Sequence, residues 1–205
     1  MHGRARPHRR LSMSPTIILP RVNISRPAPD SSIRILSSRV SPVALIACEW
    51  SELRLVRDLQ LLDSPSCYLL AGEDGEQRLR VRVGEAAKPW PRIGDHMYDR
   101  SLAWVERLFV IVGTSRFENE KWGKDDIVAL QAELSDEVKR VGRAHLHAGV
   151  GPLRFPASPA ARLEAKIILE AVRSLLADAG CPVLTPRRPS LQRTLATPAN
   201  LTLAH

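Results

Sequence analysis

A predicted β-hairpin near the middle of the chain constrains the fold more than any other stretch. Residues 66–72, Ser-Cys-Tyr-Leu-Leu-Ala-Gly, predict a strand, and the sequence Glu-Asp-Gly-Glu at 73–76 is typical of a tight connection to an antiparallel partner. In residues 78–84, basic and apolar residues alternate strictly. Because successive side chains of a strand point to opposite faces, one face of this strand should be basic and the other apolar. The basic face carries Arg78, Arg80 and Arg82.

A short helix is expected directly after this hairpin. It begins at a Pro-Trp-Pro sequence and carries Arg92 and His96, which share one helix face because they are four residues apart. Together with these two residues, the tripeptides Ser66-Cys67-Tyr68 and Arg82-Val83-Gly84 resemble the paired motifs of the GIY-YIG endonuclease family. Arg92 and His96 fall at the family's spacing beyond the second tripeptide. The resemblance covers about residues 64–143, and the flanking segments look similar to one bacterial subgroup of the family.

The segment before the hairpin predicts a small structural unit. Residues 33–36 and 43–46 predict two short strands separated by a Ser/Pro turn. Ser51 is placed to cap a short helix over residues 52–58, with an acidic residue in its first turn. Residues 1–31 are rich in Pro, Ser and Arg and are expected to be mostly disordered, although residues 16–19 could add an edge strand.

The segment after the hairpin and its helix predicts one more core strand and two long helices. Residues 104–112 predict a strand that is buried on both faces. Apolar residues at helical spacing predict a helix over residues 124–141, which Gly142 is placed to end. A second helix should begin at Ser158-Pro159 and end at Gly180. Its expected apolar stripe consists of Leu163, Ile167, Val172, Leu175 and Leu176.

These elements predict an α/β fold. The resemblance implies a small three-stranded GIY-YIG-like sheet with flanking helices, an N-terminal β-hairpin appendage and a C-terminal helical extension. The corresponding boundaries are a basic arm at 1–31, the appendage at 32–63, the GIY-YIG-like domain at 64–143, the helical extension at 144–184 and a flexible tail at 185–205.

The formal net charge of +8 is concentrated in the predicted tails. All 22 acidic residues lie between Asp30 and Asp178, whereas residues 1–29 hold six arginines and residues 184–205 hold three more. Basic tails can attract phosphates in a salt-dependent way, or they can simply keep the protein soluble. No apolar run approaches the roughly 20 residues that a membrane span needs. The three cysteines are scattered without metal-ligand spacing, which favours a reduced, cytoplasmic location.

The resemblance implies specific roles for several residues. In the family, water attacks a phosphodiester with the help of one divalent metal ion, so Mg²⁺ or Mn²⁺ would be the cofactor of an active protein. Arg92 and His96 match the residues that stabilise the phosphate and the leaving group, and Tyr68 matches the first motif's tyrosine. Arginine suits this role because its guanidinium stays charged and can bind two phosphate oxygens at once. The alternatives are a surface ion pair for Arg92, an ordinary surface histidine for His96 and strand packing for Tyr68.

Two positions depart from the family pattern. Arg82 stands where the second tyrosine is expected, and a guanidinium cannot act as a general base because its pKa lies above about 12. Gln131 stands where the metal-binding glutamate is expected, and its neutral amide would leave Mg²⁺ without a protein carboxylate. A shift of two residues in the alignment would place Glu133 there instead. These departures indicate that cleavage is lost or weakened.

What the sequence retains is a basic face with Arg78, Arg80, Arg82 and Arg92. It suits sequence-independent contact with the nucleic-acid backbone, with DNA as the expected partner, although a solvated face neutralised by Glu73, Glu76 and Glu85 is an alternative. The pair His145 and His147 suggests a metal only weakly, because no cysteine or acid lies near it in the sequence. The predicted function is nucleic-acid binding on a divergent GIY-YIG scaffold. The alternatives are an active Mg²⁺-dependent endonuclease and a protein-interaction module on the same fold.

Overall fold

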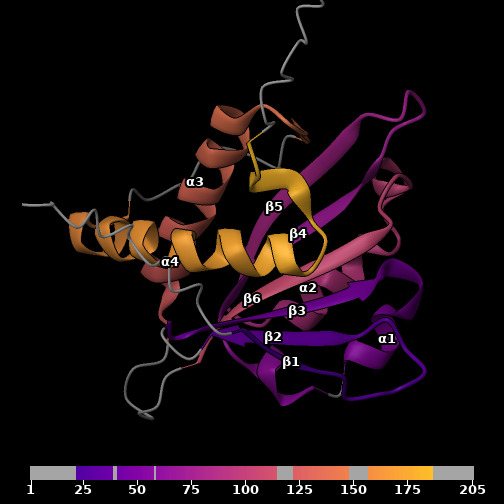
Figure 1. The fold of residues 1–205 in the computed structure, drawn as a ribbon, viewed down its shortest axis with the longest axis horizontal. Coiled ribbons are helices and arrows are strands. Elements are labelled where there is room, and N and C mark those ends of the chain that lie inside the picture. Colours follow the sequence, from indigo (N-terminus) through magenta and orange to yellow (C-terminus); the bar gives the residue numbers. More distant parts are fainter. Residues whose placement is uncertain (1–21, 39–40, 58, 115–121, 148–156, 187–205) are drawn as a thin grey trace, which may run out of the picture.

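A computed structural model describes residues 22–38, 41–57, 59–114, 122–147 and 157–186. Most of them belong to one mixed α/β arrangement, drawn in Figure 1. The strands are β1 (Val22–Ser25), β2 (Arg34–Ser38), β3 (Val43–Glu49), β4 (Ser66–Glu73), β5 (Leu79–Ala86), β6 (Arg107–Gly113) and β7 (His145–Leu146). The α-helices are α1 (Leu53–Val56), α2 (Pro89–His96), α3 (Lys124–Val141) and α4 (Pro159–Asp178). Short 3₁₀ turns are η1 (Trp50–Glu52), η2 (Gln60–Asp63), η3 (Arg100–Leu102) and η4 (Pro182–Leu184).

All seven strands belong to a single sheet with the order β1-β2-β3-β6-β4-β5-β7. Every neighbouring pair is antiparallel except β5 and β7, which are parallel. The small three-stranded sheet that the resemblance implied is therefore not a separate sheet. Its strands β6, β4 and β5 are adjacent, but β3 pairs with β6 along its whole length, from Val43 opposite Gly113 to Glu49 opposite Arg107.

The burial of β3 and β6 explains this larger sheet. Residues 43–48 and 108–112 are buried without interruption, so neither strand can lie at an exposed edge or face water on one side. The strands β2 and β3, predicted as an appendage, thus extend the central sheet. The strand β1 lies within the segment predicted to be a disordered arm, whereas the edge strand suggested for residues 16–19 falls outside the described residues.

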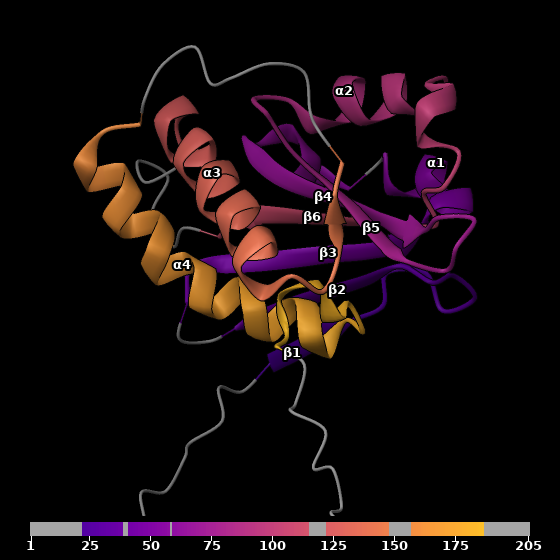
Figure 2. The same cartoon turned by 90° about the horizontal axis from the view of Figure 1, so that it is seen from above.

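Helices cover both faces of the sheet. Figure 2 shows α3 and α4 on one side and α2 on the other. One apolar cluster joins α3 and α4 to strand residues such as Leu69, Val83 and Phe109. The second joins α1 and α2 to residues of the opposite face, among them Tyr68 and Val110. Within the described part of the chain, no helix is long and apolar enough to cross a membrane.

Several local predictions are confirmed. Helix α3 has the predicted bounds and ends at Gly142, whose φ of 63° lies in the left-handed region where glycine is favoured. The Ser158 hydroxyl accepts a hydrogen bond from the Ala161 N–H and so caps α4. In the β4–β5 hairpin, the Asp74 carboxylate accepts hydrogen bonds from the backbone N–H groups of Glu76 and Arg78.

The predicted apolar stripe of α4 is partly wrong. Val172, Leu175 and Leu176 are buried, but Leu163 and Ile167 are 64% and 69% exposed. The helix instead packs through smaller residues in its first turns, Ala161 and Ala165 among them, which allows α4 to lie close to the rest of the core. Periodicity alone did not distinguish these two adjacent helix faces.

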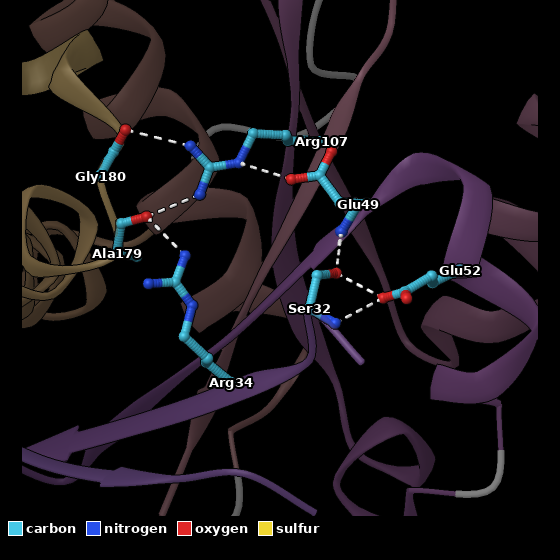
Figure 3. Close-up of polar contacts among 7 residues, drawn as sticks. All are labelled: Ser32, Arg34, Glu49, Glu52, Arg107, Ala179 and Gly180. Carbon is cyan, nitrogen blue, oxygen red and sulfur yellow. Dashed lines mark hydrogen bonds and ion pairs between the residues drawn. The ribbon is translucent and has the colours of Figure 1, made fainter. Parts of the chain in front are cut away.

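Two arginines fasten the C-terminal end of α4 to the sheet (Figure 3). Arg34 of β2 and Arg107 of β6 both donate hydrogen bonds to the Ala179 carbonyl, at 3.1 and 2.6 Å, and Arg107 also donates to the Gly180 carbonyl at 3.1 Å. These carbonyls belong to the end of a helix, where intrahelical donors are lacking and cations are favoured. Arg107 also lies 3.9 Å from the Glu49 carboxylate, so the cluster ties β2, β3, β6 and α4 together.

Replacing Arg107 by methionine should lower the free energy of unfolding by about 1 to 2 kcal/mol, because charged donors to helix-end carbonyls are lost. Urea denaturation followed by circular dichroism would measure this. The control is Lys139→Met, which breaks an exposed ion pair with Asp136 and should change stability by less than about 0.5 kcal/mol. An Arg107→Met protein as stable as the wild type would show that the Arg107 hydrogen bonds to the end of α4 do not contribute to the free energy of unfolding.

Candidate nucleic-acid interface

The site is built around the contact between Tyr68 on β4 and Gly84 on β5. The two residues face each other directly across the antiparallel pair. A Cβ atom added to Gly84 would lie 2.3 Å from Cζ and 2.4 Å from Oη of Tyr68, so the tyrosine ring occupies the space that a side chain would need. The glycine of the second tripeptide thus allows the tyrosine of the first to lie flat over β5.

His96 completes the buried part of the site from α2. A hydrogen bond of 2.9 Å joins its Nε2 atom to the Tyr68 hydroxyl, and both residues are less than 6% exposed. Burial, together with the charges of Arg82 and Arg92, lowers the pKa of His96 to about 4. Burial also raises the pKa of Tyr68 above its usual value, despite the opposing effect of the same two arginines. At neutral pH both groups are therefore uncharged.

Arg82 is the buried cation of the site. It lies on the same face of β5 as Gly84, two residues away, and is only 7% exposed. Among the described residues it makes no ion pair within 4 Å, and its charge acts on Tyr68, His96, His147 and Asp99. Asp99 is the acid in this group, and its carboxylate accepts hydrogen bonds from the backbone N–H and the hydroxyl of Ser101.

Arg92 brings a second, exposed cation to the same place. It lies on α2 one turn before His96, and its charge lowers the pKa values of both His96 and Tyr68. The structure therefore brings together four residues that the sequence singled out: Tyr68, Arg82, Arg92 and His96. Two cations and two neutral polar groups converge here, which is a chemistry suited to binding an anion.

A neighbouring cluster extends this site along β5 and was not anticipated from the sequence. Arg80 lies 5.1 Å from the Trp104 ring, and its guanidinium lies 3.2 Å from Nδ1 of His147. His147 also contacts the Trp104 ring, with centroids 5.6 Å apart. The pairing of β7 with β5 brings His147 to this position. No local sequence pattern predicts the pairing of β7 with β5, so the cluster could not be predicted from residue spacing.

The other candidate residues lie elsewhere. Arg78 sits at the hairpin end, where its side chain forms ion pairs with Asp74 and Glu76. Gln131 belongs to α3 on the opposite face of the sheet, where its amide nitrogen lies 3.5 Å from the Val83 carbonyl oxygen. Glu133 is also on α3. The structure does not bring these three residues together with Tyr68 and His96.

The residues at the site do not fit a Mg²⁺ or Mn²⁺ ion. Hard divalent cations prefer several carboxylate and carbonyl oxygens, whereas the described residues of this site offer two guanidinium groups, an imidazole, a phenol and a single carboxylate, Asp99, which is hydrogen-bonded to Ser101. Among the described residues, no group of three or more His, Cys, Asp or Glu side chains is arranged to hold a metal. Glu85, the nearest acid on β5, instead binds the Lys124 ammonium group at 2.6 Å.

The chain matches no protein-family model, no curated protein and no solved structure.

The Gly84→Ala substitution should destabilise the protein by about 2 to 3 kcal/mol, because the new methyl group overlaps the Tyr68 ring. Denaturant unfolding would measure the change, and the cost should shrink in a Tyr68→Leu background, where the ring is absent. Gly94→Ala is the matched control: nothing lies within 4 Å of a Cβ there, and alanine is the better helix former. Equal costs of Gly84→Ala in both backgrounds would contradict the proposed packing.

Stability should fall as the pH is lowered from about 6.5 towards 4. In this range His96 is protonated in the unfolded chain but stays neutral in the folded protein, so protonation favours unfolding. The loss should be of the order of 1 to 2 kcal/mol and should shrink in His96→Gln. Urea unfolding at a series of pH values would measure it. His147 has a lowered pKa for similar reasons and contributes in the same direction, so His147→Gln serves as the comparison. An unchanged pH profile in His96→Gln would mean that His96 does not titrate as described.

Proposed function

We propose that this protein binds nucleic-acid phosphates at Tyr68, Arg82, Arg92 and His96, on a divergent GIY-YIG scaffold whose ability to cleave is lost or weak. The elements β4, β5, α2, β6 and α3 follow one another in the order that the resemblance implies, and β6, β4 and β5 are neighbours in the sheet. Both observations support the scaffold part of the proposal. DNA is the nucleic acid we expect.

The buried guanidinium of Arg82 is the observation that carries the binding part. An arginine at 7% exposure loses most of its hydration, and such burial is costly unless an anion compensates it. Within the described residues, no carboxylate forms an ion pair with it. A phosphate that reaches Arg82 and the exposed Arg92 together would supply the missing negative charge. Desolvation of Arg82 therefore destabilises the free protein, and a bound phosphate would offset this penalty.

Weak cleavage follows from the groups that surround this phosphate. Arg82 replaces the tyrosine that the family uses, and the raised pKa of Tyr68 keeps that phenol protonated. His96 is neutral, but a pKa of about 4 makes it a poor proton acceptor. The expected metal-binding position, Gln131, lies across the sheet. Among the described residues, the site therefore offers no effective base, and its one acid, Asp99, is already hydrogen-bonded to Ser101.

Arg82→Met should weaken duplex DNA binding about tenfold near 100 mM salt and lower the salt dependence by about one phosphate contact. Its stability should stay close to that of the wild type, because removing a nearly buried charge without an ion pair offsets the loss of its attraction to Asp99. Arg92→Ala should weaken binding to a similar extent. Fluorescence anisotropy with a labelled duplex at several salt concentrations would measure both effects.

The control for this experiment is Arg162→Met. It removes the same charge from an exposed position on α4, which covers the opposite face of the sheet, and should leave affinity within about twofold. If Arg82→Met and Arg92→Ala bound as tightly as the wild type, the proposed site would be wrong, and a protein-interaction module would become the better explanation of the same fold.

A plasmid-nicking assay with Mg²⁺ or Mn²⁺ separates binding from catalysis. We expect no metal-dependent cutting, or only slow cutting, from the wild type. Efficient nicking that disappears in Arg92→Ala would instead establish an active endonuclease. In that case Glu133→Gln would be the next variant to test as a metal ligand.

A further inference from the structure

A second concave surface lies on the outer side of α2, between this helix and α1. It is an open cleft of about 430 Å³. Arg54 of α1 and Arg57, just after α1, line one side, while Trp90, Asp95 and Tyr98 line the other side from α2 and the residues just after it. None of the five takes part in the phosphate site already described.

The aromatic residues of the cleft are accessible to solvent and so to a binding partner. Tyr98 is 83% exposed, and Trp90 is half-buried where it packs against the core. The adjacent Met97 is 38% exposed. Exposed large side chains that gather at one concave spot are typical of a binding surface rather than of a random surface.

The cations of the cleft are also available. Arg54 and Arg57 are exposed, and among the described residues neither forms an ion pair with a carboxylate. The Arg57 guanidinium lies over the Trp90 ring, 5.9 Å from its centre, so a cation and an aromatic ring adjoin each other at the cleft. This pairing of aromatic rings with arginines suits a nucleotide, which has a flat base beside an anionic phosphate.

The position of the cleft links it to the phosphate site. Both are built on α2, and Asp95 of the cleft is one helix turn beyond Arg92, so the two residues are neighbours on the helix surface. A strand whose phosphate is held at Arg82 and Arg92 could therefore pass around α2 into the cleft. The bases of a continuous duplex are stacked inside the helix and cannot enter such a site, whereas an unpaired base can.

We propose that the α1–α2 cleft binds an unpaired nucleotide adjacent to the phosphate at Arg82 and Arg92. Its base stacks on Tyr98 and Trp90, and its own phosphate pairs with Arg54 and Arg57. The Asp95 carboxylate is placed to accept a hydrogen bond from an exocyclic amino group of the base. This inference rests on the proposed function and narrows it: the preferred partner is a nucleic acid with a single-stranded end, gap or flap rather than a continuous duplex.

The test compares two labelled DNAs, a blunt duplex and the same duplex with a short single-stranded overhang. Wild-type protein should bind the overhang DNA more tightly. Tyr98→Ala should lose about five- to tenfold in affinity for the overhang DNA and little for the blunt duplex, since a stacking contact is removed and no buried contact is disturbed. Trp90→Leu keeps an apolar side chain against the core and should show the same selective loss.

Leu55→Ala is the matched control, because Leu55 is exposed on α1 but does not line the cleft. It should bind both DNAs as the wild type does. In addition, the overhang DNA should quench tryptophan fluorescence in the wild type more strongly than in Trp90→Leu, which reports stacking directly.

The outcomes separate this inference from the proposed function. Equal wild-type affinity for the two DNAs, or overhang binding that Tyr98→Ala and Trp90→Leu leave intact, would overturn the role of the cleft while leaving the phosphate site standing. Blunt-duplex binding that is insensitive to Arg82→Met and Arg92→Ala would overturn the phosphate site. Overhang selectivity that still depended on Tyr98 in that case would show that the cleft acts alone.

Discussion

The burial of β6 on both faces is the constraint on which the rest of the structure depends. Residues 108–112 form a continuous apolar strand, so β6 needs hydrogen-bonding neighbours at both edges and cover on both faces. The neighbours are β3 and β4, which are also buried along most of their length. The cover is α3 and α4 on one side and α1 and α2 on the other. Each of the two apolar clusters, and each candidate site, exists because this central strand requires both layers.

The same two-sided sheet decides which polar residues can cooperate. Tyr68 and Arg82 point to the α2 face, whereas Gln131 packs against Val83 on the α3 face. Because the sheet separates these residues, they cannot all contact one phosphate, as the cleavage reaction of the family would require. The face that holds Tyr68, Arg82 and His96 can bind an anion with two cations and two neutral polar groups, whereas its one acid among the described residues, Asp99, is hydrogen-bonded to Ser101 and alone supplies too few ligands for a hard metal ion. This division is the physical basis of the binding without efficient cleavage that we propose.

Helix α2 contributes residues to three different surfaces of the protein. Ile93 is fully buried against the sheet, His96 and Arg92 face the phosphate site, and Trp90 and Asp95 line the outer cleft. An eight-residue helix can do this because successive residues are rotated by about 100° around its axis. A nucleic acid that crosses α2 would meet a phosphate-binding group on one side and an aromatic surface on the other.

Much of the fold, but less of its assembly, could be predicted from the sequence. The hairpin at 66–84, the helix at 124–141 and the caps at Gly142 and Ser158 depend on local preferences, which act within a few residues, and the structure agrees with them. The convergence of Tyr68, Arg82, Arg92 and His96 was also within reach, because strand alternation and helix spacing place them. The exposed Leu163 and Ile167 show the limit of such reasoning, since two adjacent faces of α4 were nearly equal in apolar character.

The tertiary structure alone decided the rest. That β3 joins β6 in one sheet, that His147 reaches Arg80, that Arg34 and Arg107 meet the end of α4, and that a cleft forms between α1 and α2 all depend on contacts between residues far apart in the chain. Local sequence determined which segments are strands and helices and which residues alternate between faces. Long-range packing determined which of those faces meet, because burial of apolar surface selects the partners of an element without leaving a pattern within that element.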